Sequence, residues 1–483
     1  MLEDFIIQRI RAELPFVPNA EKDGLFRLLG AFLVSPCHEK CFLLKGYAGT
    51  GKTSVVSALV RALEGLRQPC VLLAPTGRAA KVLASYSGKP AFTIHKCIYR
   101  QQQLGIEAFS LADNRHKQTL FIVDEASMLS ATRDNGVFGS GSLLDDLIKY
   151  VYSGDGCSLL FLGDDAQLPP VGSLNSPALD ADRLRSYGLE VSAFSLTQVA
   201  RQALDSGILA NATRIREQLT HFPSYKSLDF SVESLAFRCF SDMQFPMSAP
   251  DVQPLANEVF IDTLEQAYRE VGEEETLIIT RSNKRTNLFN QGVRSRILWK
   301  EDELSAGDRL MVCKNNYFWT QDYDNLPFIA NGDMFEVVRL RKEREMYGFR
   351  FVDASLRAMD YDFEIDCMLW IDSLLADSPA DTVALQKQLF SRIAEDYPEI
   401  RNRKEMTKKI FESPYYNALQ VRFAYAVTCH KAQGGQWKRI FLDLPLIVND
   451  TNAENGHPMQ QQEYLRWLYT AVTRATEILY VLR

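Results

Sequence analysis

A phosphate-binding loop constrains the fold of this chain more than any other part of the sequence. The segment Gly46-Tyr47-Ala48-Gly49-Thr50-Gly51-Lys52-Thr53 matches the pattern GxxxxGK[ST] in full. It follows an apolar run, Cys41 to Leu44, that is typical of a buried strand, and it precedes helical apolar spacing from Ser54 to Leu63. This strand-loop-helix order predicts a loop whose backbone N–H groups and helix N-terminus face an anion.

The residue types in this loop predict a site for ATP with Mg²⁺. The small residues let successive N–H groups turn inward around phosphate oxygens. Lys52 is expected to reach the β- and γ-phosphates, and the Thr53 hydroxyl is expected to ligate Mg²⁺. We therefore assign ATP binding to the whole loop, which consists of Gly46, Tyr47, Ala48, Gly49, Thr50, Gly51, Lys52 and Thr53.

Two further strand ends carry polar side chains that suit hydrolysis. Asp124 and Glu125 follow the apolar strand Leu120 to Val123. We expect Asp124 to hold the metal, and Glu125 to orient or deprotonate the attacking water. Gln167 follows a later strand, Leu159 to Leu162, and its amide suits a sensor of the γ-phosphate or of its water.

Short apolar strands alternate with helical segments, which predicts an α/β fold with parallel sheets. At 483 residues the chain exceeds what one core usually organises, so we expect two or more domains. In such sheets ligands bind beyond the carboxyl ends of the strands. The first set of strands is Cys41 to Leu44, Val71 to Ala74, Leu120 to Val123 and Leu159 to Leu162, and the second is Leu277 to Thr280, Val421 to Val427, Arg439 to Leu442 and Glu477 to Leu482.

Two stretches interrupt this alternation. Tyr99 to Gln118 is polar, and it is either a small hairpin or a surface loop. Between Glu301 and Tyr415, turn-separated apolar runs predict a small β-barrel inserted into the second α/β domain. The second domain has no phosphate loop of its own. We therefore expect the nucleotide to lie between two domains, the second of which completes the site.

Charge and apolar patterning limit the class of protein. The 54 Lys and Arg residues against 61 Asp and Glu residues give a net charge of -7, which argues against a general nucleic-acid coating protein but allows a local basic groove. Nine cysteines without CxxC pairs are typical of reduced thiols. No apolar run approaches the ~18 residues of a membrane span. These features predict a soluble, cytoplasmic protein with no membrane partner.

Several short segments accompany the phosphate loop in a fixed order: Ala74 to Lys81, Thr93 to Lys96, Asp124 to Met128, Gly163 to Gly172, Val199 to Gln202, Thr428 to Gly434 and Tyr469 to Ala475. This ordered set resembles that of the superfamily-1 helicases, and within them most resembles the RecD and Dda group. The resemblance runs from about Pro18 to the C-terminus, and the set is far more specific than any one of its members.

The resemblance implies a motor with two RecA-like domains that moves along single-stranded DNA, by group analogy from 5′ to 3′, and opens duplex at single-strand/duplex junctions. Repair or replication proteins are the further partners that it implies. It also implies an N-terminal helix (1–17), a domain 1A (18–192) with an insertion 1B at about 99–118, a domain 2A (193–300 plus 416–483), and an inserted SH3-like barrel 2B (301–415).

The same resemblance assigns roles to individual residues. Arg201 and Arg474 match two arginines that the second domain contributes to the γ-phosphate. A guanidinium that arrives only when domains close stabilises the charge of the transition state. The residues that match motifs lining the DNA path, where phosphate contacts carry no base identity, are Thr76, Arg78, Thr93, His95, Thr428, His430 and Lys431.

One position departs from the pattern, and three questions stay open. Relatives usually carry a Gln that reads adenine ahead of the phosphate loop, whereas Asn19-Ala20-Glu21-Lys22 puts Lys22 there, which leaves adenine selectivity open. The chain is alternatively an ATPase subunit of a larger recombination assembly, or a nucleotide-switched binding module that does not translocate. RNA also stays open as the polymer, because phosphate contacts do not test the 2′-hydroxyl.

Overall fold

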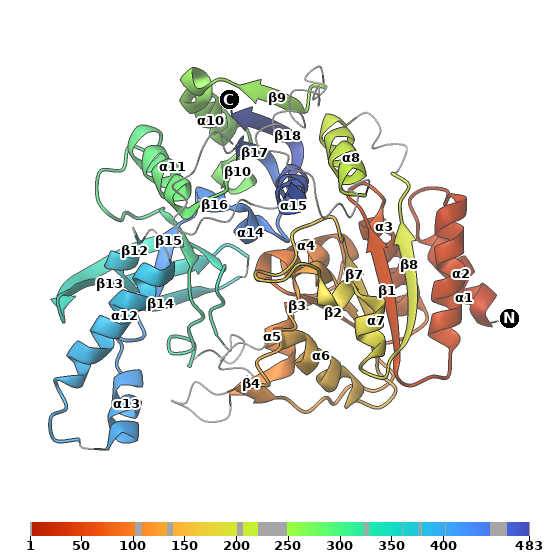
Figure 1. The fold of residues 1–483 in the computed structure, drawn as a ribbon, viewed down its shortest axis with the longest axis horizontal. Helices are drawn as coiled ribbons and strands as arrows, with labels where there is room; N and C mark the ends of the chain where they lie inside the picture. Colours follow the sequence, from red (N-terminus) through yellow and green to blue (C-terminus); the bar gives the residue numbers. More distant parts are fainter. Residues whose placement is uncertain are drawn as a thin grey trace, which may run out of the picture.

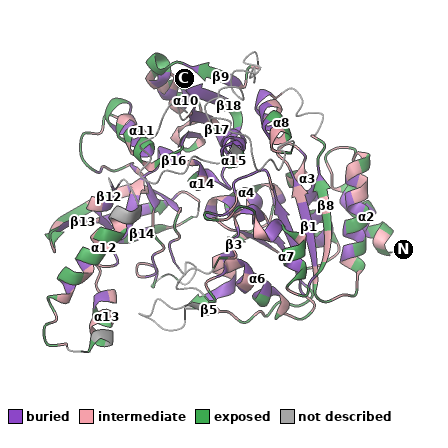
Figure 2. Cartoon of the chain, in the orientation of Figure 1, coloured by how far each residue is buried: buried purple, intermediate pink, exposed green. Residues whose placement is uncertain are grey.

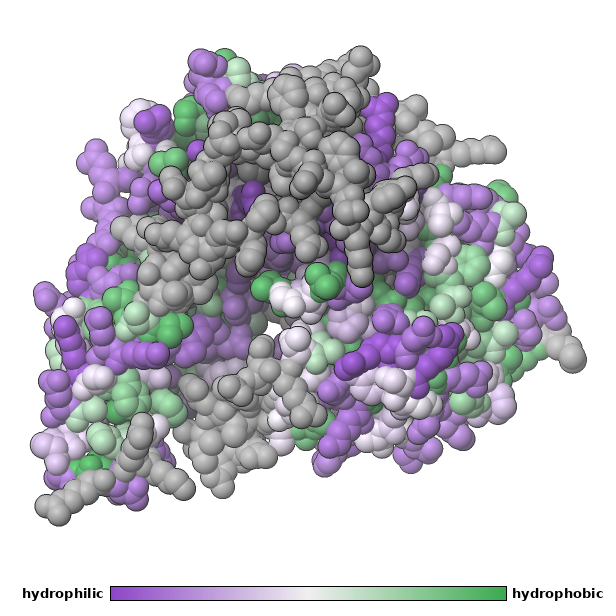
Figure 3. Space-filling view, viewed as in Figure 1, coloured by the Kyte–Doolittle hydropathy of each residue, from purple (hydrophilic) through white to green (hydrophobic). Residues whose placement is uncertain are grey.

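The computed structural model contains two parallel β-sheets and a closed β-barrel, which lie at the right, the top and the left of Figure 1. It describes residues 2–101, 109–132, 139–199, 206–220, 249–321, 323, 328–360, 362–374, 376, 379–400, 402–444 and 461–482. Within these ranges, the apolar stretches of all helices are too short to span a bilayer. On the face shown in Figure 3, hydrophilic side chains cover much of the described surface, and apolar ones form small separate groups.

The first sheet contains the strand that leads into the phosphate loop. Its six strands are all parallel, in the order β3 (Ala91–Thr93), β2 (Cys70–Ala74), β6 (Leu120–Val123), β7 (Ser158–Gly163), β1 (Lys40–Gly46) and β8 (Glu190–Leu196). The helices of this domain are α1 (Leu2–Ala12), α2 (Ala20–Val34), α3 (Lys52–Gly65), α4 (Gly77–Ser87), α5 (Ile94–Ile98), α6 (Leu143–Tyr152) and α7 (Ala181–Arg185).

Alternating side chains give this sheet two apolar faces. Phe42 and Leu44 of β1 share a core with apolar residues of α1, α2 and α3. Cys41 and Leu43 point to the opposite face and pack with residues of α5 and α6. Figure 2 shows the central strands buried, with exposed residues mostly on the outer helices. Because helices cover both faces, the polar side chains of the site gather at the carboxyl edge of the sheet.

The second sheet is also entirely parallel. Its order is β16 (Ala426–Thr428), β10 (Thr276–Thr280), β17 (Trp437–Asp443), β18 (Ala475–Leu482) and β9 (Val252–Leu255). The helices that belong to it are α8 (Gly207–Thr220), α10 (Phe260–Val271), α11 (Asn283–Arg296), α14 (Cys429–Ala432) and α15 (Gln461–Val472). The predicted α/β fold with two parallel sheets is therefore confirmed.

The predicted barrel is present as a closed five-stranded sheet made of β11 (Arg309–Val312), β12 (Met334–Met346), β13 (Phe349–Ala358), β14 (Glu364–Trp370) and β15 (Leu419–Phe423). Between β14 and β15 the chain forms two further helices, α12 (Pro379–Ala394) and α13 (Arg403–Phe411), which share a core with β13 and β14. The segment from Tyr99 forms an antiparallel pair, β4 (Tyr99–Gln101) with β5 (Phe109–Leu111), so the hairpin alternative is confirmed, although residues 102–108 lie outside the described ranges.

Three boundaries differ from those predicted. The single strand predicted at Val421 to Val427 is two strands, because β15 closes the barrel whereas β16 joins the second sheet. The barrel thus extends to Phe423 rather than ending at 415. The first sheet extends to Leu196 rather than to 192, because β8 pairs with β1 along its whole length. Apolar runs alone do not tell which sheet a strand joins.

Candidate functional site

The phosphate loop connects the end of β1 to the first turn of α3, at the carboxyl edge of the first sheet. Gly49 and Gly51 have φ values of +75° and +88°, in the region that favours glycine. Thr50, between them, is buried, and its hydroxyl donates to the Tyr47 carbonyl over 2.8 Å. The loop is therefore a tight turn that ends at the N-terminus of α3, where Thr53 lies in the first turn.

Lys52 carries the positive charge of the loop. Its Nζ donates to the carbonyl oxygen of Tyr47 over 3.0 Å and also to that of Gly46. It lies 3.9 Å from Oδ2 of Asp164, whose side chain is 1% exposed. Burial raises the pKa of Asp164, and the Lys52 ammonium opposes this rise. A lysine and a buried carboxylate therefore lie together beside the loop.

A tyrosine from the second domain joins this pair to the loop backbone. Tyr469 on α15 donates its hydroxyl proton to Asp164 Oδ2 over 2.7 Å and accepts the backbone N–H of Ala48 over 2.8 Å. Burial raises the pKa of Tyr469 well above its ordinary value, so the hydroxyl keeps its proton. The sequence gives Tyr469 no predicted role, because its partners lie 305 and 421 residues away.

Asp124 and Glu125 follow β6 at the same edge of the sheet. Oδ1 of Asp124 accepts the backbone N–H of Glu125 over 2.8 Å, and its Oδ2 accepts the hydroxyl of Tyr86 from α4. Glu125 has a φ of +50°, which is uncommon for a residue with a side chain. Such backbone strain concentrates at active sites. The local geometry at this strand end thus singles out Glu125.

The oxygen donors at this edge fit Mg²⁺, which prefers one or two carboxylates together with waters and substrate phosphates. Thr53 offers a hydroxyl at the start of α3, and Asp124 offers a carboxylate at the end of β6. Across the described part of the chain, no three His, Cys, Asp or Glu side chains gather as an all-protein metal site. This donor set therefore suits a metal that binds together with a triphosphate.

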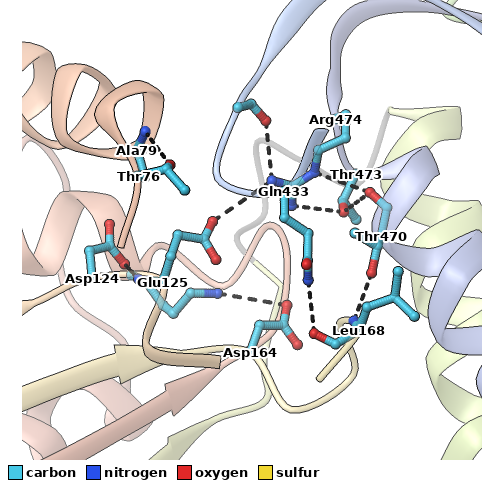
Figure 4. A network of polar contacts seen from close by, with 12 residues as sticks. Thr76, Ala79, Asp124, Glu125, Asp164, Leu168, Gln433, Thr470, Thr473 and Arg474 are labelled. Carbon is cyan, nitrogen blue, oxygen red and sulfur yellow. Dashed lines mark hydrogen bonds and ion pairs between the residues drawn. The ribbon is translucent and has the colours of Figure 1, made fainter. Parts of the chain in front are cut away.

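Arg474 reaches the same edge from the second domain, as Figure 4 shows. Its Nη1 lies 3.8 Å from Oε1 of Glu125, and the arginine side chain is 3% exposed. Its Nε and Nη1 donate to the carbonyl oxygens of Thr470 and Gly435, each over 3.1 Å. Burial raises the pKa of Glu125, and Arg474 partly offsets that rise. The two domains therefore face each other across this ion pair.

Gln167 lies in the loop after β7 and is buried. Its Oε1 has no hydrogen-bond partner among the described residues, so a buried acceptor is available to a donor on water or ligand. The next residue, Leu168, donates its N–H to Thr470 Oγ1 over 2.9 Å and accepts from Gln433 Nε2 over 2.8 Å. The second domain thus holds the Gln167 loop. Arg201 lies outside the described residues.

The candidate DNA contacts lie at strand ends of both sheets. Thr76 and Thr93 cap α4 and α5, and each hydroxyl accepts a backbone N–H three residues on, over 3.2 and 3.3 Å. Thr428 precedes α14, which contains His430 and Lys431, and Lys431 donates to the Asn331 side chain from the barrel region. Capping alone accounts for the two threonine hydroxyls of the first domain.

Arg78 is tied to the second domain and to the barrel. Its Nη1 lies 3.2 Å from Oδ1 of Asp360, its Nη2 donates to the Gln436 carbonyl over 3.2 Å, and its guanidinium lies 5.1 Å from the ring centroid of Trp437. The Arg78 side chain is 19% exposed. In this conformation Nη1 and Nη2 of Arg78 bind protein groups, whereas its buried Nε has no partner among the described residues.

His95 is packed among aromatic rings. Its ring centroid lies 5.7 Å from that of Tyr99 and 5.9 Å from that of Phe328. Burial lowers the pKa of His95 from 6.5 to about 4, so the imidazole is neutral at neutral pH. A neutral imidazole forms hydrogen bonds with a phosphate but adds no charge to them.

This burial predicts a pH-dependent stability difference between the wild-type protein and a His95→Phe variant. The unfolded chain binds a proton near pH 6.5, whereas the folded chain does so only near pH 4, so His95 costs stability as pH falls between these values. The full difference is about 3 kcal/mol. Urea unfolding of both proteins at several pH values within this window measures it. Parallel pH profiles of the two proteins would contradict the burial of a neutral imidazole.

Comparisons with known proteins match both halves of the chain. Residues 33–229 match the family described as an AAA domain, and residues 423–482 match the family described as a UvrD-like helicase C-terminal domain. The ATP-dependent RecD2 DNA helicase of Deinococcus radiodurans is 30% identical over 202 residues, which are 41% of this chain and 24% of that protein. The ATP-dependent DNA helicase dda of Enterobacteria phage T4 is 22% identical over 459 residues, 91% of this chain and 93% of that one.

Among solved structures, a Pif1 helicase from Bacteroides in complex with ADP-AlF3 and ssDNA is similar at a TM-score of 0.45 and 15% identity. The similarity covers 96% of this chain and 92% of that one. Both family matches include segments that the sequence singles out: the first contains the phosphate loop and Asp124-Glu125, and the second contains Thr428 to Gly434 and Arg474.

Proposed function

This chain is a superfamily-1 P-loop helicase of the RecD and Dda group, and we propose that it couples ATP hydrolysis to movement along single-stranded DNA and to duplex unwinding. By analogy with the group, we propose movement from 5′ to 3′. ATP is the substrate held by residues 46–53, and single-stranded DNA with its duplex junctions is the track. Repair or replication proteins are the further partners that we propose.

The observation that carries the proposal is the Arg474–Glu125 pair. Glu125 belongs to the domain with the phosphate loop, whereas Arg474 belongs to the other domain, and 3.8 Å separates Nη1 from Oε1. A base beside the attacking water and a guanidinium beside the γ-phosphate are the groups that phosphoryl transfer requires. In our proposal, hydrolysis therefore depends on the two domains being closed on each other.

Mg²⁺ is proposed to bind to the Thr53 hydroxyl and the Asp124 carboxylate, where it would neutralise charge on the phosphate oxygens. The chain's own residues have separate roles in the proposal. Lys52 binds the β- and γ-phosphates, Glu125 takes a proton from water, and the Gln167 amide orients that water. Arg474, with Arg201 as its proposed counterpart, binds the γ-phosphate from the second domain.

In our proposal, contacts between the two domains couple ATP hydrolysis to domain movement. The backbone of Leu168, next to Gln167, is bound on both sides by Thr470 and Gln433 of the second domain. The Tyr469 hydroxyl binds the Ala48 N–H of the phosphate loop. A nucleotide that binds the closed arrangement better than the open one shifts the equilibrium between the two. The distance between the DNA-path residues of one domain and those of the other then alternates between two values. Stepping along the DNA strand requires such an alternation.

The test is unwinding of partial duplexes that carry either a 5′ or a 3′ single-stranded tail, with and without ATP. We expect strand separation only with ATP and the 5′ tail, and a many-fold stimulation of ATP hydrolysis by single-stranded DNA. Lys52→Ala is the inactive control, because it removes the phosphate-binding ammonium. Duplexes with an RNA tail test whether the track is DNA alone.

Each contrary result rejects a separate part of the proposal. Unwinding from the 3′ tail alone would reverse the proposed direction. ATP hydrolysis that single-stranded DNA does not stimulate, without strand separation on either substrate, would favour the nucleotide-switched binding module. Unwinding that appears only after another protein is added would favour a subunit of a larger assembly.

A further inference from the structure

Lys22 is a buried cation beside the phosphate loop that has no role in the proposed hydrolysis. It lies in the first turn of α2, and 3% of the residue is exposed. A Cβ built on Gly51 would lie 3.4 Å from Cε and 3.8 Å from Nζ of Lys22. Gly51 is the N-cap of α3, a helix of 14 residues. The Lys22 ammonium therefore lies next to a helix end with positive partial charge, which repels it.

The carboxylate of the neighbouring Glu21 offsets this charge only in part. The Lys22 ammonium has no hydrogen bond or ion pair within the described residues, and it lies 5.6 Å from the centroid of the apolar Phe16 ring, in a cation–π contact. The carboxylate of Glu21, next to it on α2, instead accepts the N–H and the hydroxyl of Thr197, each over 2.8 Å. Burial lowers the pKa of Lys22. A buried cation without an acceptor is costly, so an anion is the ligand that this position suits.

We propose that Lys22 is a second phosphate-binding lysine, which contacts the triphosphate held by the loop from beside Gly51. The inference rests on the proposed function, because it requires that residues 46–53 bind a nucleoside triphosphate. Lysine has three donors and no acceptor, so it cannot receive the amino group of adenine as a glutamine does. Phosphate oxygens, in contrast, only accept. The site therefore binds triphosphates without reading the amino group of the base.

The experiment compares Lys22→Met with the wild-type protein in two measurements. Calorimetric titration is carried out with Mg²⁺ complexes of ATP, GTP and inorganic tripolyphosphate. Lys22→Met should weaken the binding of all three ligands by the same factor, roughly 10- to 100-fold. Thermal unfolding without nucleotide should show a higher Tm for Lys22→Met, because a buried charge without a hydrogen bond or ion pair is removed. Affinity and stability then move in opposite directions, which a purely structural lysine does not produce.

Lys40→Met is the matched control. Burial also lowers the pKa of Lys40, but its Nζ donates to the carbonyl oxygens of Phe32 and Ser35 over 2.7 and 2.6 Å. Its loss should lower the Tm and leave all three affinities unchanged.

Three results would overturn the assignment of Lys22. Weaker binding of ATP with unchanged binding of tripolyphosphate would make Lys22 a base contact. Unchanged binding of all three ligands would show that Lys22 does not contact the triphosphate. A lower Tm in the absence of nucleotide would make it a structural residue. Failure of the wild-type protein to bind ATP would instead reject the proposed function itself, so the two failures are distinguishable.

Discussion

Arg474→Ala is expected to lower kcat for DNA-stimulated ATP hydrolysis by roughly 10³- to 10⁵-fold, the range of an arginine that stabilises phosphoryl transfer from across a domain interface. The Arg474 guanidinium lies 3.8 Å from Glu125, and two carbonyl oxygens fix its orientation. Arg474→Lys should recover little of this loss, because an ammonium lacks the planar set of donors. ATP affinity should change far less than kcat, because the phosphate loop belongs to the other domain.

The matched control for this prediction is Arg439→Ala. Arg439 lies on β17 of the same sheet, its side chain is 11% exposed, and it forms an ion pair with Glu477. Its removal takes away a comparably enclosed guanidinium and should reduce stability without a change in kcat. Steady-state rates and equilibrium ATP binding of both variants separate the two effects. An Arg474→Ala enzyme with nearly wild-type kcat would reject the role of Arg474, whatever its stability.

Local patterns in the sequence predict the elements that carry the nucleotide site. The loop at 46–53 requires a strand before it and a helix after it, and β1 and α3 occupy those positions. Asn19 caps α2, because a side-chain oxygen ahead of an apolar helical run satisfies a free N–H at the helix start. Short strands such as β3 and β9 carry a weaker signal. They were not predicted, because neither Ala91–Thr93 nor Val252–Leu255 is a continuous apolar run, and β9 contains a proline.

Contacts between the domains are the part that the sequence does not predict. Tyr469, Gln433 and Thr470 lie in segments that the sequence singles out, but their partners Ala48 and Leu168 are 265 to 421 residues away. Spacing rules describe residues within one helix, strand or loop, and they give no information on which loops meet across an interface. The motifs therefore indicate where chemistry occurs, whereas the fold decides which side chains meet there.

The candidate DNA contacts also show that a motif indicates a location, whereas the fold decides which side chains meet. A motif assigns Arg78 to the DNA path, but in the structure this guanidinium binds Asp360 and the carbonyl of Gln436. Asp360 lies just beyond β13 of the inserted barrel, so a contact between the barrel and the first domain occupies the arginine. No local pattern around either residue predicts that contact. The motif therefore places Arg78 near the DNA path, whereas the fold decides which groups its guanidinium contacts.

Glu125→Gln is expected to retain ATP binding and to lower kcat by roughly 10²- to 10⁴-fold, the contribution of a positioned general base. Glutamine keeps the size of the side chain, but it cannot take a proton from water. Burial raises the pKa of Glu125, so the wild-type kcat should fall as pH drops through a value above that of an ordinary glutamate. This fall of kcat at low pH is the acidic limb of the pH–rate profile, and the residual rate of Glu125→Gln should lack it. Single-turnover hydrolysis across a pH series, together with ATP binding, measures both effects.

Glu477→Gln is the control for this change of carboxylate to amide, because Glu477 forms its ion pairs with Lys438 and Arg439 of β17 rather than with residues of the nucleotide site. It should keep both the wild-type kcat and the acidic limb. If Glu125→Gln hydrolysed ATP at nearly the wild-type rate, the general base would have to be another group. The buried acceptor of Gln167 would then position the attacking water without help from Glu125. If the acidic limb persisted in a slow Glu125→Gln enzyme, the limb would belong to a different carboxyl group, and Asp164 is the candidate, since burial raises its pKa as well.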